Sequence, residues 1–317
     1  MDLVFGPVPS RRLGRSLGIN SIPPKVCSYG CSYCQVGATG VPEIAPRPFF
    51  EPDEIFEAVA GRIRSVSADG GHIDYVTFVP DGEPTLDSRL GETIDLLKPL
   101  GIPVAVITNG SLLWRAEVRL ALGGADWVSV KVDAADQVTW RRVNAPRRSL
   151  GFEQVREGMG VFADTFGGTL ATESMLLAGI NDGAGSVEGI AAFVARLGPE
   201  TAYVAVPIRP PRRSGVRPPD EASLNRAYQI FAARVPHVEL LLGYEGDAFA
   251  STGDLRTDLL SITAVHPLRR SAVARLTERC GASPEDVELL VAEGAVAWVG
   301  YLGEDFLVRR PHEVLGA

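Results

Sequence analysis

Three cysteines lie close together near the start of the chain, and their spacing points most clearly to chemistry. Cys27, Cys31 and Cys34 share one predicted loop, whereas the only other cysteine in the sequence is Cys280. Three thiolates from one loop can bind three irons of a cubane and leave the fourth iron without a protein ligand. An iron with an open position can bind a reactant, so the spacing indicates a catalytic iron–sulfur centre rather than simple electron storage.

A structural zinc site is the alternative interpretation of the same cysteines. Zinc usually takes four ligands, often from paired Cys-x2-Cys units, so Cys280 would have to be the fourth. Cys280 follows Val273 and Leu276 at helical spacing, and we therefore predict that it lies in a hydrophobic core. The cluster interpretation is preferred. The rival functions are a non-catalytic nucleic-acid-binding protein with a structural zinc or iron–sulfur centre, and an electron-transfer protein.

The segment Asp81-Gly82-Glu83-Pro84 is a second candidate for chemistry, because it follows a predicted strand. The Glu83 carboxylate and backbone carbonyls freed at a strand end could accept hydrogen bonds from a cationic amine. Standing alone, the segment would be an ordinary strand-to-helix turn with a carboxylate near the helix start. Together with the cysteines, it favours a ligand-binding role.

Weaker candidates lie on the next predicted strands. Asn109 ends one strand, where it could line a site or simply form a turn. Ser129, Lys131 and Asp133 alternate along the following strand and could face a barrel interior. Glu173, on a later strand, has the same status. A polar barrel core is an equally good interpretation of these residues.

Two groups of arginines flank the predicted site. One group precedes the first predicted barrel strand, and the other follows the last. Guanidinium groups suit phosphate or carboxylate recognition, although a run of charges is more often a solvated surface. The groups are Arg11, Arg12 and Arg15, and Arg209, Arg212, Arg213 and Arg217.

The elements that must position these residues alternate between strands and helices. Short β-branched and aromatic runs predict strands, and amphipathic patterns between them predict helices, the clearest starting at Pro52. This alternation predicts a parallel α/β sheet whose strand carboxyl ends form the active-site edge. Six strands are too few for a standard eight-fold barrel, so we predict a partial (β/α)6 barrel. The predicted strands are 16–22, 73–80, 103–109, 126–133, 170–180 and 202–208.

The last part of the chain differs in composition. Residues 209–219 are rich in proline and arginine, and a predicted helix (220–234) and strand (238–244) follow. Two further predicted helices and a hairpin then suggest a winged-helix shape. We therefore predict a barrel over residues 1–235, a connecting segment over 236–261 and a small winged-helix-like C-terminal unit over 262–317.

The overall composition is that of an ordinary globular protein, with 45% hydrophobic and 22% charged residues in a chain of 317. No apolar run reaches the ~18–20 residues of a membrane span, and the N-terminus lacks the features of a signal peptide. Few, clustered cysteines suit a reducing compartment, so we expect a cytoplasmic protein with no membrane partner. The net charge of −8 gives no global attraction to nucleic acid, although a local basic patch could bind RNA.

At the cysteine loop the chain resembles the radical SAM enzymes. Their signature is Cys-x3-Cys-x2-Cys with an aromatic residue before the last cysteine, and Tyr33 occupies that position. The N-terminal run Phe5–Asn20 is similar to the subgroup related to wyosine-type tRNA-modifying enzymes, and Ile262–Pro267 resembles the C-terminal unit of other members. The resemblance therefore covers nearly the whole chain.

The resemblance implies that the three clustered cysteines bind a [4Fe–4S] cluster whose open iron chelates S-adenosylmethionine (SAM). One electron then cleaves SAM to methionine and a 5′-deoxyadenosyl radical, which abstracts a hydrogen atom from the substrate. The segment 81–84 resembles the family's Gly-Gly-Glu-Pro segment, with Asp81 replacing the first glycine, and implies contacts to the SAM amino group. The residues expected around the cofactor are Tyr33, Asp81, Gly82, Glu83, Pro84, Asn109, Ser129, Lys131 and Asp133.

The resemblance leaves the substrate open. It implies an oxidoreductase that receives electrons from a low-potential donor such as ferredoxin or flavodoxin, with a tRNA base as one candidate substrate. Members that build the tricyclic wyosine base carry additional cysteines for a second cluster, which this chain lacks, so wyosine synthesis itself is not expected. Activation of a partner protein by hydrogen abstraction, and modification of a peptide or small metabolite, are the alternatives.

Overall fold

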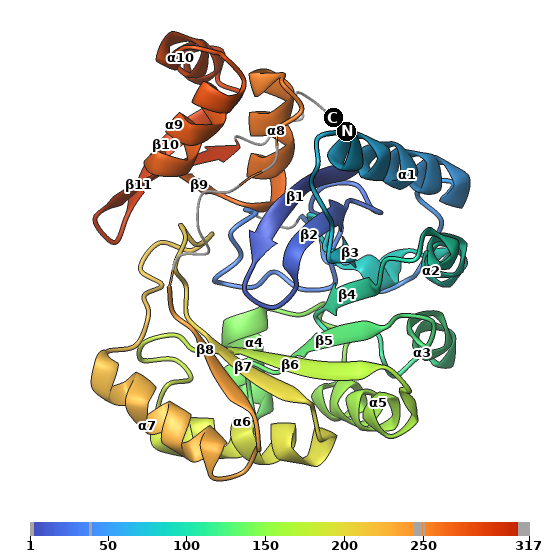
Figure 1. The fold of residues 1–317 in the computed structure, drawn as a ribbon. Coiled ribbons are helices and arrows are strands. Elements are labelled where there is room, and N and C mark those ends of the chain that lie inside the picture. The colour runs from blue at the N-terminus through green and yellow to red at the C-terminus, as the bar shows by residue number, and fades with distance from the viewer. Residues whose placement is uncertain (1–2, 38–39, 244–248, 250, 310–317) are drawn as a thin grey trace.

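One eight-stranded sheet, curled into a partial barrel, dominates the computed structural model (Figure 1). The structure describes residues 3–37, 40–243, 249 and 251–309. The strands follow one another across the sheet in chain order; β2 to β8 run parallel, and β1 pairs with β2 in the antiparallel direction. The strands are β1 (Val4–Ser10), β2 (Gly14–Ile19), β3 (Tyr75–Phe78), β4 (Val104–Thr108), β5 (Trp127–Lys131), β6 (Thr169–Met175), β7 (Thr201–Ala205) and β8 (Val238–Leu241).

Helices connect the parallel strands and cover the outside of the sheet (Figure 1). The first begins as the sequence predicts, because Pro52 suits the first helical turn and the acidic Asp53 and Glu54 favour the helix N-terminus. Its Ile55 and Val59 are buried in the main core. The helices are α1 (Pro52–Ala68), α2 (Leu90–Leu97), α3 (Ala116–Leu122), α4 (Gln137–Asn144), α5 (Phe152–Thr165), α6 (Ala184–Leu197) and α7 (Glu221–Ala232), with short 3-10 turns at Pro84–Leu86 and Lys98–Leu100.

Strand alternation decides which residues enter the barrel. On β5, Val128 and Val130 belong to the main hydrophobic core between the sheet and the helices, whereas Trp127 belongs to a separate cluster of inward-facing residues. Because successive side chains point to opposite faces, Ser129 and Lys131 share the inner face with Trp127. The carboxyl end of β5 therefore places Lys131 on the inner face of the barrel.

The six predicted barrel strands are confirmed as β2 to β7, and two further strands extend the sheet. The predicted strand at 238–244 appears as β8, which pairs in parallel with β7, so the sheet continues past the predicted barrel end at residue 235; Tyr244 lies outside the described residues. The sequence does not predict β1, because Gly6, Pro7 and Pro9 are rare inside strands. Such residues are tolerated here because β1 is an edge strand.

A second hydrophobic core lies in the C-terminal part of the chain, beside β1 (Figure 1). Three helices pack there with a three-stranded sheet in the order β10-β11-β9. Their bounds are α8 (Leu255–Val265), β9 (Leu268–Arg269), α9 (Arg270–Arg279), α10 (Pro284–Ala292), β10 (Val296–Tyr301) and β11 (Glu304–Arg309).

The limits and the winged-helix shape of this C-terminal unit stay predictions. The second core includes Phe249, Leu255 and Leu259, so its packing begins before the predicted start of the unit at residue 262. Residues 310–317 of the predicted unit lie outside the described residues. The unit contacts the barrel, where the Tyr301 hydroxyl donates to the Pro207 carbonyl at 3.0 Å. In the described part of the chain, no helix has both the length and the apolar character needed to cross a bilayer.

Candidate active site

The three clustered cysteines line one cavity of about 270 Å³ at the carboxyl ends of the parallel strands. The walls include Thr108 from the end of β4, Lys131 from the end of β5, and Glu173 from β6. Parallel α/β sheets form their ligand sites at this edge, because the connecting loops converge there. The structure therefore brings the cysteine loop and the strand ends together at one edge of the sheet, as the sequence predicts.

The cysteine loop has no regular secondary structure, and backbone hydrogen bonds to distant segments hold it in place. On one side, Gly30 N donates to Asn144 O at 3.0 Å, at the end of α4. On the other side, Arg212 N donates to Cys34 O at 2.8 Å. Both flanks of the loop are therefore anchored to other parts of the fold.

Two side-chain amides point at two of the thiols. Asn109 Nδ2 lies 3.7 Å from Cys27 Sγ, and Asn144 Nδ2 lies 3.5 Å from Cys31 Sγ. Burial raises the pKa of Cys31 to about 12, and burial also raises the pKa values of Cys27 and Cys34. The metal-free thiols are therefore protonated at neutral pH, and metal ions must displace those protons. The amides would then stabilise the thiolates that form.

The donor set fits a cluster that keeps one iron open. Three thiols line the cavity, while Cys280 packs against the second core, with its Sγ 3.0 Å from Ser251 Oγ. Cys280 is only partly buried at the end of α9, so it lies at the edge of this core and not inside it as predicted. Within the described residues, no three His, Cys, Asp or Glu side chains are placed to hold a single metal ion. Thiols at separate points around a cavity suit a multi-iron cubane, which binds each cysteine at a different corner.

Gly82 brings the Glu83 segment against the cysteine loop. A Cβ atom on Gly82 would lie 1.9 Å from the Val26 carbonyl oxygen, so a side chain at this position does not fit. The Glu83 backbone N donates to the same carbonyl at 3.0 Å. Because Val26 precedes Cys27, this close approach locks the two predicted motifs together.

The Glu83 carboxylate is buried and held by four donors. Its Oε1 accepts from Thr85 N at 3.1 Å, Thr85 Oγ1 at 2.6 Å and Thr108 Oγ1 at 2.5 Å, and its Oε2 accepts from Asn109 N at 2.8 Å. Burial raises the pKa of Glu83, and these hydrogen bonds oppose that rise by stabilising the ionised form. Glu83 therefore offers a fixed acceptor at the cavity wall. Sequence analysis missed Thr85 and Thr108, whose only signal is their closeness to Glu83 and Asn109.

Asp133 ties the cysteine loop to the sheet. Its Oδ2 accepts from the Tyr33 hydroxyl and from Asn144 Nδ2, the latter at 2.7 Å, and its Oδ1 accepts from Met175 N at 2.8 Å. Burial raises the pKa of Asp133, while Lys131 opposes that rise. Because both carboxylate oxygens already have donors and Asp133 does not line the cavity, its direct contact with SAM stays a prediction. Sequence analysis missed Asn144 and Met175.

Lys131 and Arg12 share one carboxylate at the cavity wall. Both cations form ion pairs with Glu173, although Arg12 comes from the turn between β1 and β2. Burial lowers the pKa of Lys131, but Glu173 and Asp133 more than compensate, so the net shift is upward. Lys131 Nζ also lies 5.5 Å from the centre of the Tyr33 ring. The site thus keeps Lys131 protonated.

The structure separates the predicted site residues into two groups. Some line the cavity, and the others lie outside its lining. The lining residues are Tyr33, Gly82, Glu83, Asn109, Lys131 and Glu173, together with the arginines Arg11, Arg12 and Arg209. The others are Asp81, Pro84, Ser129 and Asp133, which are buried, and Arg15, Arg212, Arg213 and Arg217, which are exposed.

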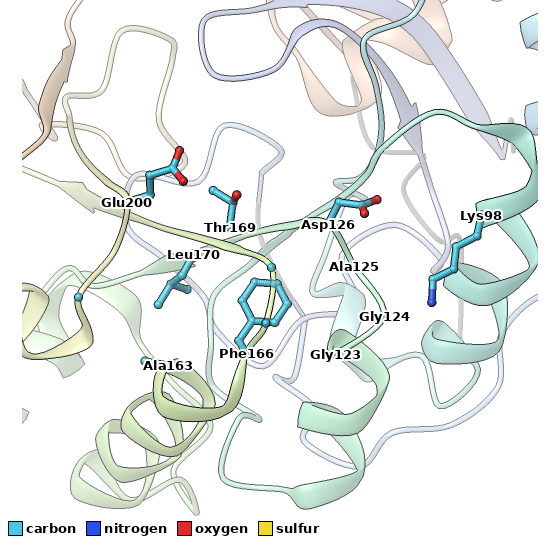
Figure 2. Close-up of a pocket in the computed structure, with 13 residues that line it drawn as sticks. Lys98, Gly123, Gly124, Ala125, Asp126, Ala163, Phe166, Thr169, Leu170 and Glu200 are labelled. Carbon is cyan, nitrogen blue, oxygen red and sulfur yellow. The ribbon is translucent and has the colours of Figure 1, made fainter.

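A larger hollow of about 700 Å³ lies at the opposite end of the sheet (Figure 2). Glycine-rich turns before β5, β6 and β7 form it, with Phe166 and Asp126 in its walls. None of the clustered cysteines and no residue of the Glu83 segment lines it. The amino ends of barrel strands generally serve stability rather than catalysis, so the smaller cavity is the candidate active site.

Comparison with known proteins agrees with this geometry. A sequence model of the Radical SAM superfamily matches residues 21–188. A UPF0026 protein from Methanocaldococcus jannaschii is 40% identical over 98% of this chain and 96% of its own length.

Two solved structures share the fold. The structure of TYW1 with a lysine-pyruvate adduct bound has a TM-score of 0.53 and 16% identity, and the match covers 70% of this chain and 74% of that one. A radical SAM methyltransferase from Sphaerobacter thermophilus has a TM-score of 0.55 and 17% identity, over 72% of this chain and 66% of that one. At such low identity, these likenesses concern the fold alone.

Proposed function

The chain belongs to the radical SAM superfamily of SAM-dependent enzymes with a [4Fe–4S] cluster, and we propose that Cys27, Cys31 and Cys34 hold that cluster. One observation carries this proposal. The three thiols and the fixed Glu83 carboxylate line a single cavity at the carboxyl edge of the sheet. An open iron and an acceptor for a cationic amine are what SAM chelation requires.

The chain's own residues orient the reactants and exclude water. Glu83, held by Thr85 and Thr108, accepts hydrogen bonds from the SAM amino group. Asp133 fixes Tyr33 and thereby the loop that presents the thiolates. When bound, the cluster supplies the electron that cleaves SAM reductively, so that a 5′-deoxyadenosyl radical can take a hydrogen atom from the substrate.

The cavity arginines support a phosphate-bearing substrate, and a tRNA base is the candidate that we put first. Arg11, Arg12 and Arg209 line the cavity, and guanidinium groups bind phosphate oxygens in pairs. Modification of a peptide or small metabolite, and activation of a partner protein, are the alternatives. The cytoplasm is the compartment that suits the reduced cluster and its low-potential electron donor, ferredoxin or flavodoxin.

The test is reductive cleavage of SAM under anaerobic conditions. The protein is reconstituted with iron and sulfide, reduced with dithionite and supplied with SAM, and 5′-deoxyadenosine is measured by mass spectrometry. We expect the product with the native chain and with Cys280→Ser, and none with Cys27→Ala. An intact cluster that yields no 5′-deoxyadenosine would refute the proposal.

A further inference from the structure

Six exposed arginines lie on two segments whose backbones contact the cysteine loop. They come from two segments that are far apart in the sequence: the end of α4 with the turn after it, and the extended segment after β7. We name them the cysteine-loop arginine patch: Arg141, Arg142, Arg147, Arg148, Arg212 and Arg213.

Both segments contact the cysteine loop directly. Arg147 N donates to Ser28 O at 3.0 Å, on the α4 side of the loop. On the other side, Arg212 Nη1 donates to Gly30 O at 2.9 Å. A Cβ atom on Gly30 would come within 2.9 Å of the same Arg212 nitrogen, so the guanidinium lies against the loop backbone. Arg212 therefore binds the carbonyl of the residue directly before Cys31.

The patch is a local concentration of positive charge on an acidic protein. The segments 140–150 and 206–219 contain no aspartate or glutamate, and neither does the loop segment 26–42, although the chain carries a net charge of −8. In the described part of the chain, no carboxylate forms an ion pair with a patch guanidinium. Uncompensated exposed charges of one sign attract and orient a partner of the opposite sign.

We propose that the cysteine-loop arginine patch docks an acidic one-electron carrier protein of the flavodoxin or ferredoxin class, which reduces the cluster; this inference rests on the proposed function. One electron leaves the carrier, which is oxidised by one unit, and enters the cluster, which is reduced by one unit. No covalent bond forms or breaks in this step. Short-lived electron-transfer encounters use small interfaces and depend on electrostatic steering, which a patch of six charges provides.

The position of the patch favours a protein carrier over RNA. None of the patch arginines lines the cavity, whereas Arg11 and Arg12 line the cavity in which the substrate must react. A carrier needs to reach only the loop that bears the cluster ligands.

The test compares two charge-reversal variants of the reconstituted holoenzyme. Patch positions Arg141, Arg148 and Arg213 are changed to glutamate; within the described residues their side chains make no hydrogen bond or ion pair. The control reverses three exposed arginines: Arg64 on α1, Arg226 on α7 and Arg234 just after α7. The side chains of Arg226 and Arg234 make only local hydrogen bonds, to Ser223 Oγ and the Ile230 carbonyl. Stopped-flow absorbance measures cluster reduction by a reduced bacterial flavodoxin at increasing NaCl concentrations. An Arg→Lys triple variant at the patch positions keeps the charge.

We expect the second-order rate constant to fall at least about tenfold in the patch variant at low salt, and the loss to shrink as salt screens the charges. The control and the Arg→Lys variants should stay within about threefold of the native protein. Equal losses in patch and control variants would overturn the docking proposal.

Dithionite separates docking from cluster assembly. Dithionite should reduce the cluster and support 5′-deoxyadenosine formation equally in all variants. If the patch variant alone loses these activities with dithionite, the docking proposal is overturned. If the native protein forms no 5′-deoxyadenosine with dithionite, the proposed function is overturned instead. Filter binding with a total tRNA pool tests whether the patch binds RNA instead of a carrier protein. If the patch variant loses tRNA binding but keeps flavodoxin reduction, the patch is an RNA surface and the proposal is wrong.

Discussion

The Asn144 side-chain nitrogen lies 3.5 Å from Cys31 Sγ, and it also donates to Asp133 at 2.7 Å. One amide at the end of α4 thus contacts a cysteine of the loop and the carboxylate that fixes Tyr33. The surroundings of the cysteines are therefore built by α4 and the segment after β5 as much as by the cysteine loop itself.

Replacing Asn144 should make the cluster harder to reduce. Asn144→Leu removes a hydrogen bond to a cluster thiolate, and such bonds favour the reduced, more negative state. We expect a more negative reduction potential in a titration monitored by electron paramagnetic resonance. The free energy of unfolding should also fall by about 1–3 kcal/mol, because Asp133 loses a buried donor. Asn225→Leu, on the exposed side of α7, is the control, and an unchanged potential in Asn144→Leu would contradict this role.

Local patterns predict the frame of this site but not the contacts that hold it. The β-branched run of β4 and the Asn109-Gly110 turn after it place Asn109 at the active-site edge from sequence alone. The contact between Asn144 and Cys31 joins residues 113 positions apart and depends on how α4 packs, so no local pattern reveals it. Likewise, the run that forms β1 contains two prolines and resembles a turn, so the sequence does not predict this strand. Only the fold shows that Arg12, which follows β1, forms an ion pair with Glu173.

Gly82→Ala should prevent normal assembly of the cluster site. The new Cβ would lie 1.9 Å from the Val26 carbonyl oxygen, so the Glu83 segment and the residue before Cys27 must move apart. Backbone displacement of this kind costs about 1–3 kcal/mol in stability. We expect less iron bound per chain after reconstitution and a lower melting temperature. Gly160→Ala is the matched control, since no atom lies within 4 Å of its added Cβ. Equal iron content in both variants would count against the role of Gly82.

Glu83→Gln should weaken SAM binding while leaving the cluster in place. Either orientation of the amide points its NH₂ group at an existing donor: Thr85 and Thr108 on one side, or the Asn109 backbone N–H on the other. Loss of a charge-assisted hydrogen bond to the SAM amine costs about 1.5–3 kcal/mol, which corresponds to about 10- to 150-fold in the dissociation constant. Equilibrium dialysis with labelled SAM measures this value, and Glu57→Gln on the exposed side of α1 is the control. An unchanged affinity for SAM would show that Glu83 does not bind the SAM amino group.

Ionisation of the buried Asp81 should lower the free energy of unfolding as pH rises. Burial raises the pKa of Asp81 to about 6, and Lys25 and Arg309 oppose that rise. Because the folded-state pKa is higher than the unfolded value of about 3.9, the native state holds the proton more tightly, and this stabilisation is lost as pH rises from about 4 to 6.

Asp81→Asn should therefore gain stability relative to the native chain by about 2–3 kcal/mol between pH 4 and pH 7. Urea unfolding at four pH values measures this difference. The double variant with Lys25→Met separates the effect of Asp81 from that of its buried partner. A difference between Asp81→Asn and the native chain that does not change with pH would show that Asp81 keeps an ordinary pKa.

The most direct test of the central claim is electron–nuclear double resonance on the reduced cluster in the presence of SAM labelled at its amino nitrogen and carboxylate carbon. If Cys27, Cys31 and Cys34 leave one iron open, both labelled nuclei couple to the cluster in the native chain and in Cys280→Ser. An intact, reduced cluster that shows no coupling to either nucleus would contradict the account.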